Sequence, residues 1–95
     1  MKITFSARHF EPSEKLQKFA QDELSTLEKY FSGDLTGEIM LNQNGNLKEV
    51  EMRIHALGKV LPSKVDGDDF YKIIPAAVTK LEKQLKAEKS KKTNH

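Results

Sequence analysis

Cysteine is absent from this chain of 95 residues, and so are the hydrophobic runs of secreted and membrane proteins. Without cysteine there is no disulfide framework and no thiolate nucleophile or ligand, so packing alone must hold the domain together. The first ten residues lack the apolar core of a signal peptide, and no run approaches the roughly 18 apolar residues of a membrane span. These absences predict a soluble cytoplasmic protein.

Patterns for catalysis and metal binding are also missing. The aspartates between residues 66 and 69 suggest a calcium loop, but the further oxygen ligands and the glutamate at the twelfth position are absent. Helix capping explains these aspartates better. The histidines are scattered, and no nucleophile or glycine-rich phosphate loop accompanies them. We therefore expect no enzymatic activity, no metal or cofactor, and no small-molecule substrate.

Positive charge is distributed unevenly along the chain. The formal net charge is only +2, yet residues 79–95 hold six lysines and two glutamates, which leaves a small negative excess elsewhere. Such asymmetry is typical of a segment that binds a polyanion, although a solvated helix can also be rich in lysine. The length and the hydrophobic content of 37% fit one domain with one core.

Hydrophobic periodicity predicts a strand, a helix and a hairpin in the first half of the chain. Residues 2–7 alternate as a half-buried strand. Ser13 is placed to cap a helix that continues to Phe31, with apolar residues three and four positions apart. From Leu35 the period becomes two. The Asn-Gly in QNGN at 43–46 predicts a hairpin, because both central residues of an Asn-Gly turn need positive φ.

Two further strands complete a predicted sheet. Val50, Met52 and Ile54 alternate with charged residues, so the second hairpin strand has one buried apolar face and one charged face. KVLPSKV at 59–65 is typical of a fourth strand. Because proline cannot donate to a ladder, Pro62 predicts that this strand lies at an edge of the sheet.

The second helix is expected within DDFYKIIPAAVTKLEKQLKAEKSKK, residues 68–92, with Asp68 or Asp69 as its cap. Its apolar stripe comprises Phe70, Ile74, Ala77, Val78, Leu81 and Leu85. At about 100° per residue, Lys72, Lys83 and Lys86 lie nearly opposite that stripe, with Lys80 on its flank. Pro75 leaves two alternatives open: the helix kinks there, or residues 69–73 form a separate turn and Pro75 begins the long helix.

These elements predict an α+β fold in the order β-α-β-β-β-α. Two amphipathic helices can be buried only on one face of a four-stranded sheet, so the other face is open to water or to a partner. We expect one domain over residues 1–89 and a basic, disordered tail over residues 90–95.

The ordered set of motifs resembles a known family from Lys2 to about Lys89. The set comprises a strand followed by ARH, a helix ending in LEKYF, a charged hairpin, and DDFY followed shortly by KLEKQL. At these spacings it is similar to the short ribosome hibernation-promoting factor and ribosome-associated inhibitor A family, also called the sigma-54 modulation protein family. The resemblance implies a fold related to double-stranded-RNA-binding domains.

The resemblance also implies a function and a set of residues. It implies a cytoplasmic translation inhibitor, monomeric when free, that binds the small ribosomal subunit and its ribosomal RNA in the channel for messenger and transfer RNA. The binding positions that it implies are Arg8, Lys29, Tyr71, Lys80, Lys83 and Lys86. For Tyr71 the competing interpretation is a lid on the core, and Lys29 can equally pair with neighbours on its own helix.

The chain departs from the family pattern in three places. Glu23 and Thr26 stand where members often carry arginine or lysine, so the first helix contributes less positive charge. Pro75 stands where aspartate or asparagine is common. Because the chain ends soon after the second helix, we also expect it to lack the extra C-terminal domain by which the long form pairs ribosomes.

Two alternative functions remain open from the residues alone. One is a general double-stranded-RNA-binding module without preference for the ribosome. The other is a protein-interaction domain that uses the open sheet face around Glu49, Glu51 and Arg53. The dependence of binding on salt distinguishes the second alternative, because contacts to phosphates weaken sharply as ionic strength rises.

Overall fold

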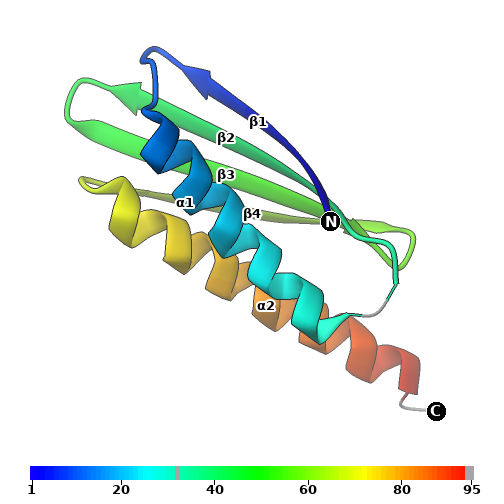
Figure 1. Ribbon diagram of the computed structural model, residues 1–95. Helices are drawn as coiled ribbons and strands as arrows, with labels where there is room; N and C mark the ends of the chain where they lie inside the picture. Colours follow the sequence, from blue (N-terminus) through cyan, green and yellow to red (C-terminus); the bar gives the residue numbers. More distant parts are fainter. Residues whose placement is uncertain (32, 94–95) are drawn as a thin grey trace.

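Two helices lie on one face of a four-stranded sheet (Figure 1). The structure, a computed structural model, describes the backbone of residues 1–31 and 33–93 and the side chains of these residues as far as Lys89. Its elements are β1 (Lys2–Arg8), α1 (Glu14–Ser25), a 3₁₀ helix η1 (Thr26–Tyr30), β2 (Thr36–Asn44), β3 (Leu47–Ala56), β4 (Lys59–Gly67) and α2 (Phe70–Thr93). The predicted α+β class and the β-α-β-β-β-α order are confirmed.

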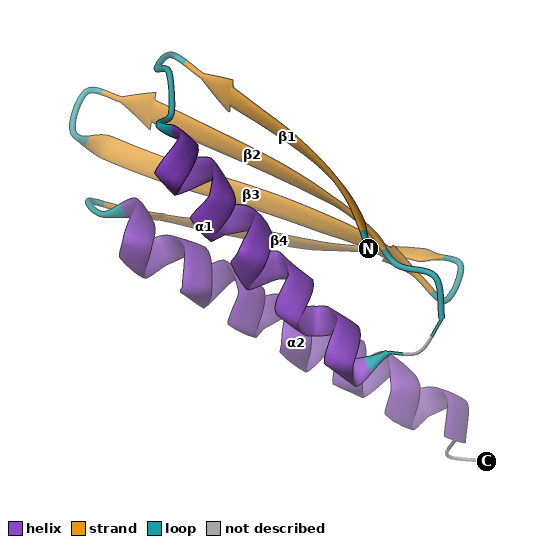
Figure 2. Ribbon diagram, in the orientation of Figure 1, coloured by secondary structure: helices purple, strands orange, loops and turns teal. Residues whose placement is uncertain are grey.

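The sheet has the strand order β1-β2-β3-β4. β1 pairs parallel with β2, whereas β2 with β3 and β3 with β4 pair antiparallel. β4 is therefore an edge strand, as Pro62 predicted. Figure 2 shows both helices on the same side of the sheet, with the opposite face uncovered. We call that uncovered side the open face. Within the described part of the chain, no helix has the length and apolar character needed to cross a membrane.

The first helix begins as predicted but ends differently. The Ser13 hydroxyl accepts a hydrogen bond from the Leu16 amide at 3.1 Å, so Ser13 is the N-cap. The α-helix ends at Ser25 and tightens into η1, whereas we expected one helix to continue to Phe31. The hydroxyls of Ser25 and Thr26 donate to carbonyls one turn earlier, and such bonds compete with regular helix geometry. A 3₁₀ turn is a common result at helix ends.

The predicted hairpin forms, but its turn is shifted by one residue. Asn44 pairs with Leu47, so Gly45 and Asn46 are the central residues. Only Gly45 has positive φ, at 65°, which fits a type II′ turn with glycine first. The expectation of positive φ at both central residues was therefore wrong here. It applies instead to the turn between β3 and β4, whose two central residues have φ of 58° and 72°.

Pro75 lies inside α2, which begins at Phe70. The Asp69 carboxylate accepts a hydrogen bond from the Tyr71 amide at 2.9 Å, and its carbonyl accepts from Lys72 and Ile73. Asp69 therefore starts the helix, and residues 69–73 do not form a separate turn. Because proline has no amide hydrogen, Pro75 cannot make the usual bond to the carbonyl four residues earlier.

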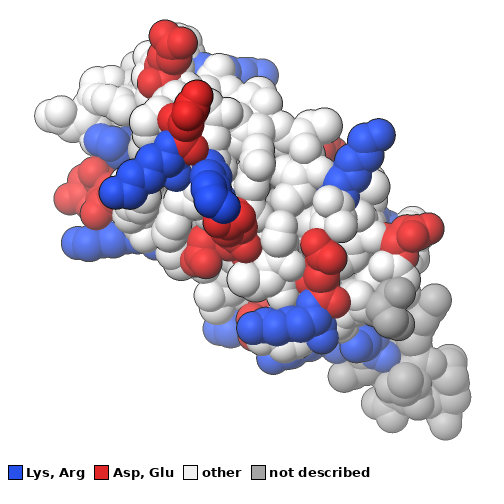
Figure 3. Space-filling view, viewed as in Figure 1, with Lys and Arg blue, Asp and Glu red and all other residues white. Residues whose placement is uncertain are grey.

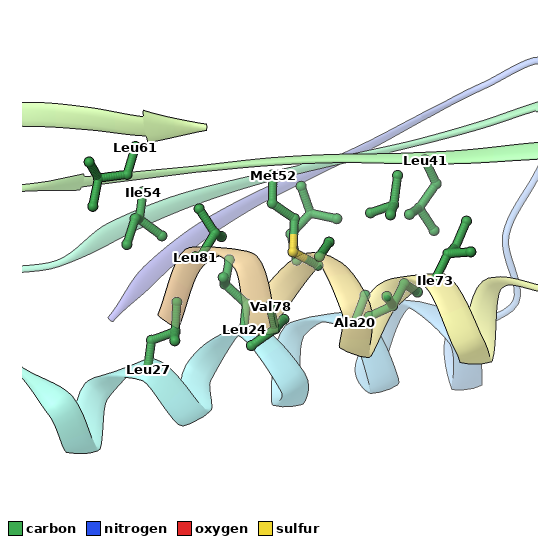
Figure 4. Packing of buried hydrophobic residues seen from close by; sticks show 14 of the residues in the cluster. Ala20, Leu24, Leu27, Leu41, Met52, Ile54, Leu61, Ile73, Val78 and Leu81 are labelled. Atoms are coloured by element: carbon green, nitrogen blue, oxygen red, sulfur yellow. The ribbon is translucent and has the colours of Figure 1, made fainter. Parts of the chain in front are cut away.

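The core lies between the helix layer and the sheet, and side chains from both layers meet there (Figure 4). All six residues of the predicted α2 stripe are buried, as are Val50, Met52 and Ile54 of β3. The Ser63 hydroxyl of β4 is also buried and donates to the Ala77 carbonyl of α2 at 2.9 Å. This bond satisfies the hydroxyl within the core and ties the helix to the edge strand.

A tail was expected over residues 90–95. The side chains of these residues, and the backbone of residues 94–95, lie outside the described part of the structure. The helix backbone of α2 is described to Thr93.

Replacing Pro75 with alanine should stabilise the domain. A proline in a helix interior loses one hydrogen bond and clashes with the preceding turn, at a cost of about 3 kcal/mol, and the change to alanine removes this cost. Because alanine gives the unfolded chain more conformational freedom, up to about 1 kcal/mol of that gain is offset. Urea denaturation should therefore show a gain of about 2 kcal/mol. As a control, Ala76→Gly in the same exposed turn should lower stability by about 1 kcal/mol. A loss of stability in Pro75→Ala would mean that the ring's packing outweighs its backbone cost.

Candidate nucleic-acid interface

Four lysines of α2 face solvent, three of them opposite the buried stripe and Lys80 on its flank beside β4. Lys72, Lys80, Lys83 and Lys86 are all exposed, whereas the apolar stripe of the same helix is buried. We call these four residues the α2 lysine face. Its direction was predicted from the helical period, and the burial of the opposite stripe confirms it.

The lysines of this face differ in how far they are engaged within the protein. The Lys80 ammonium donates to the Lys64 carbonyl of β4 at 3.3 Å, and Gln84 makes a similar bond to the Pro62 carbonyl at 2.6 Å. These two bonds hold α2 against the sheet edge. No hydrogen bond or ion pair joins Lys83 to another of the described residues. The same holds for the Lys72 side chain, so Lys72 and Lys83 are the lysines of this set most available to an external anion.

Lys86 belongs to a cluster that joins α2 to η1. Its ammonium lies 3.1 Å from the Glu82 carboxylate and 4.6 Å from the centre of the Tyr30 ring. Lys29 lies 5.5 Å from the centre of the same ring. Lys89 donates to the Tyr30 carbonyl, which fixes the end of η1 against the helix. Cations over an aromatic face are attracted by the ring's quadrupole.

The pKa of Glu82 is lowered by this environment. The hydrogen bond from Lys86 is the largest cause, and the charge of Lys86, the Tyr30 hydroxyl and the charge of Lys29 lower it further. Glu82 is therefore ionised at neutral pH. Because the pKa of the folded state is lowered, the stabilising effect of the pair is fully present at neutral pH and is lost as pH falls through that pKa.

Tyr71 lies in the same helix layer, whereas Arg8 does not. The Tyr71 ring packs against Phe19 of α1 with ring centres 4.9 Å apart, and 44% of the residue remains exposed. It thus joins the two helices and still offers a ring edge to solvent. Arg8 ends β1 on the open face, in a shallow cavity that Glu49 and Arg53 also line. The structure therefore brings five of the six predicted binding residues to the helix layer and separates Arg8 from them.

Several charged groups of the open face are paired with one another. The ion pairs are Arg53 with Glu38 at 4.0 Å and with Glu51 at 3.5 Å, and Lys64 with Glu49 at 3.8 Å. His55 and Glu38 also form a hydrogen bond at 2.7 Å. Exposed pairs of this kind contribute little stability, but they cancel the charge of the face at short range. The open face therefore has little net potential to attract phosphates.

The helix layer carries the excess of positive charge, and it comes from α2. The described side chains of α2 include five lysines and two glutamates, whereas α1 carries two lysines and three acidic residues. Figure 3 shows acidic side chains interspersed among the basic ones on this side. Glu23 and Thr26 lie at the end of α1, where the Thr26 hydroxyl donates to the Glu23 carbonyl at 2.7 Å.

Sequence reasoning missed two members of the Lys86 cluster. Tyr30 and Glu82 were part of LEKYF and KLEKQL but were given no role. Only the four-residue spacing of Glu82 and Lys86 is a local signal of pairing. Tyr30 is more than fifty positions from Lys86 in the sequence, so no local pattern could join them. Among the described residues, no group of three histidine or acidic side chains is arranged to hold a metal ion.

The chain matches a family profile and named relatives over most of its length. Residues 3–93 match the sequence profile of the family described as "Sigma 54 modulation protein / S30EA ribosomal protein". The chain is 24% identical over 91 residues to the ribosome hibernation promoting factor of Pseudomonas putida, with 96% of this chain and 89% of that protein covered. It is 27% identical over 94 residues to the ribosome hibernation promotion factor of Bacillus subtilis, with 96% and 50% covered.

A solved structure shares the fold. The N-terminal domain of Protein Y from Thermus thermophilus superposes with a TM-score of 0.86 and 25% sequence identity, over 92% of this chain and 98% of that one. The likeness thus extends over nearly all of both chains.

Removing the positive charge of Lys86 should raise the pKa of Glu82 toward its ordinary value. In Lys86→Gln the largest cause of the lowered pKa is lost, and carbon-detected NMR titration of the Glu82 carboxyl should show an upward shift. Lys83→Gln removes the same charge from the neighbouring position and should shift that pKa less. Equal shifts in the two variants would show that the summed positive charge nearby, and not the hydrogen bond from Lys86, sets the Glu82 pKa.

Proposed function

The chain belongs to the Sigma 54 modulation protein / S30EA ribosomal protein family, and from this premise we propose that it binds ribosomes and promotes their hibernation. It acts in the cytoplasm as a stoichiometric inhibitor of translation and not as an enzyme. Its partner is the small ribosomal subunit with its ribosomal RNA, where it occupies the channel for messenger and transfer RNA. The relatives' names support the role in hibernation, and the resemblance of the motifs supports the channel.

The observation that carries this proposal is the difference in charge between the two faces. Ribosomal RNA presents closely spaced phosphates, and each lysine that neutralises a phosphate releases condensed counterions. The α2 lysine face lies on a helix held in place by a buried stripe, so the backbone positions of its lysines keep a defined spacing. The paired charges of the open face offer no comparable excess. The helix layer is therefore the proposed RNA-binding side.

Contacts to phosphates position the protein but carry no information about sequence. Selection of a ribosomal channel must then come from shape, as in proteins that recognise double-stranded RNA by geometry. The domain is elongated, with principal dimensions of 48 × 21 × 18 Å. Residues 1–89 form the proposed ribosome-binding unit, monomeric when free, and the basic residues at 90–95 extend its charge.

Individual residues have distinct proposed roles. Lys80, Lys83 and Lys86 neutralise phosphates along α2, and Lys29 extends this surface onto η1. Tyr71 offers the exposed part of its ring to a base while it packs on Phe19. Arg8 is proposed as a separate contact at the end of β1, on the other side of the sheet.

Reversing the charge of Lys83 should weaken binding to small ribosomal subunits by about tenfold, because a phosphate contact becomes a repulsion. Co-sedimentation over a salt series measures this, and the neutral variant Lys83→Gln should lower the slope of log affinity against log salt by about 1. The matched control is Lys2→Glu, which makes the same change of charge on the exposed side of β1.

Equal weakening by Lys83→Glu and Lys2→Glu would contradict a binding surface on the helix layer, and unchanged binding by Lys83→Glu would exclude Lys83 from the contact. Competition then tests the choice of partner. Free duplex RNA should displace the protein from subunits readily only if it is a general double-stranded-RNA-binding module.

A further inference from the structure

The Glu82 carboxylate lies among the groups that would bind an anion on the helix layer. We propose that Lys29, Tyr30 and Lys86 form a site for one phosphate of the RNA backbone, and that Glu82 competes with this phosphate for Lys86. This inference rests on the proposed function for the identity of the RNA. It adds that a residue of the protein's own helix limits RNA affinity and so keeps binding of partly matching RNA weak.

The geometry of the cluster resembles an occupied anion site. Lys86 lies 3.1 Å from the Glu82 carboxylate and keeps 54% of its side chain exposed, so an external oxyanion can reach its ammonium group. The Tyr30 ring is half-buried, and the bond from Lys89 to its carbonyl holds it in place. Lys29 approaches the same ring from η1. Two ammonium groups from separate elements thus lie near one aromatic ring, and one of them, that of Lys86, contacts the Glu82 carboxylate.

A phosphate and the Glu82 carboxylate compete for the hydrogen bonds of the Lys86 ammonium group. Both are anions that accept hydrogen bonds from an ammonium group, so binding of phosphate either displaces the carboxylate or places two like charges side by side. The pair is exposed and therefore weak, which makes Glu82 a competitor that reduces affinity without blocking the site.

Such a competitor keeps binding of partly matching RNA weak. An RNA that reaches only the Lys86 cluster gains one contact and loses the Glu82 pair. An RNA that also presents phosphates to Lys80 and Lys83 gains contacts that require no such exchange. The cost at Glu82 is common to both RNAs, so it keeps the first kind of binding weak, while the difference in affinity comes from the added contacts to Lys80 and Lys83.

The chain contains a matched control on its first helix. Lys18 and Asp22 form a pair with the same four-residue spacing and the same 3.1 Å separation as Lys86 and Glu82. Asp22→Asn therefore makes the same change of net charge and releases one lysine from a helical pair. Both variants alter solvent-accessible side chains, so the fold should be retained, and thermal unfolding checks this.

The experiment measures affinity for a short RNA duplex and for single-stranded polyuridylate by fluorescence anisotropy at fixed salt. Glu82→Gln should tighten binding about three- to tenfold, as expected for release of one phosphate-binding lysine and removal of one like charge. Asp22→Asn should change it by less than about twofold. The gain from Glu82→Gln should fall to less than about twofold in a Lys86→Gln background, because no lysine remains to be released and only the removal of a like charge contributes.

Equal tightening by Glu82→Gln and Asp22→Asn would overturn the proposal, since net charge alone would then explain the effect. It would also be overturned by unchanged affinity in Glu82→Gln, or by a full gain in the Lys86→Gln background. Co-sedimentation of the unaltered protein with small subunits is the separate test of the proposed function. Tightening on RNA without ribosome binding would refute that function and leave the anion site standing.

Discussion

Burial of the α2 stripe against the sheet is the interaction on which the other features depend. Ile74, Leu81 and Leu85 are fully buried, and truncation of such side chains to alanine typically costs about 2–5 kcal/mol each. The Ser63 hydroxyl adds a buried bond to the backbone of the same helix. Because the stripe fixes the rotation of α2, the helical period sends its lysines outward. The hydrophobic core thereby determines the direction of the charged surface.

The two sides of the molecule differ in how their charges are arranged. On the open face, acidic and basic groups of neighbouring strands form ion pairs across the sheet, and their charges cancel at short range. On α2, lysines outnumber glutamates, and Lys83 has no partner among the described residues. Glu82 is the exception on this side, because its carboxylate engages Lys86 within the proposed RNA surface. The helix layer therefore attracts phosphates, and the Glu82 carboxylate locally reduces that attraction.

Much of this architecture could be predicted from local sequence patterns. Strand alternation, the Ser13 cap and the edge position of β4 all follow from residues close together in the chain. The 3₁₀ geometry at the end of the first helix could not be predicted from hydrophobic periodicity. It accompanies hydrogen bonds from the Ser25 and Thr26 hydroxyls to the backbone, which that periodicity does not reveal.

The candidate site was predictable only in part. The α2 lysines follow from one helical period, but the meeting of Lys86 with Tyr30 depends on how two helices pack. Arg8 matches a family position and yet lies on the opposite face.

The most direct test of the account is a lysine-labelling footprint of the protein bound to small ribosomal subunits. Acetylation rates of individual lysines, measured by mass spectrometry with and without subunits, report which face is covered. The account predicts protection of Lys80, Lys83 and Lys86 and unchanged reactivity of Lys2 on the open face. Protection of Lys2 with unchanged reactivity of the α2 lysines would contradict it.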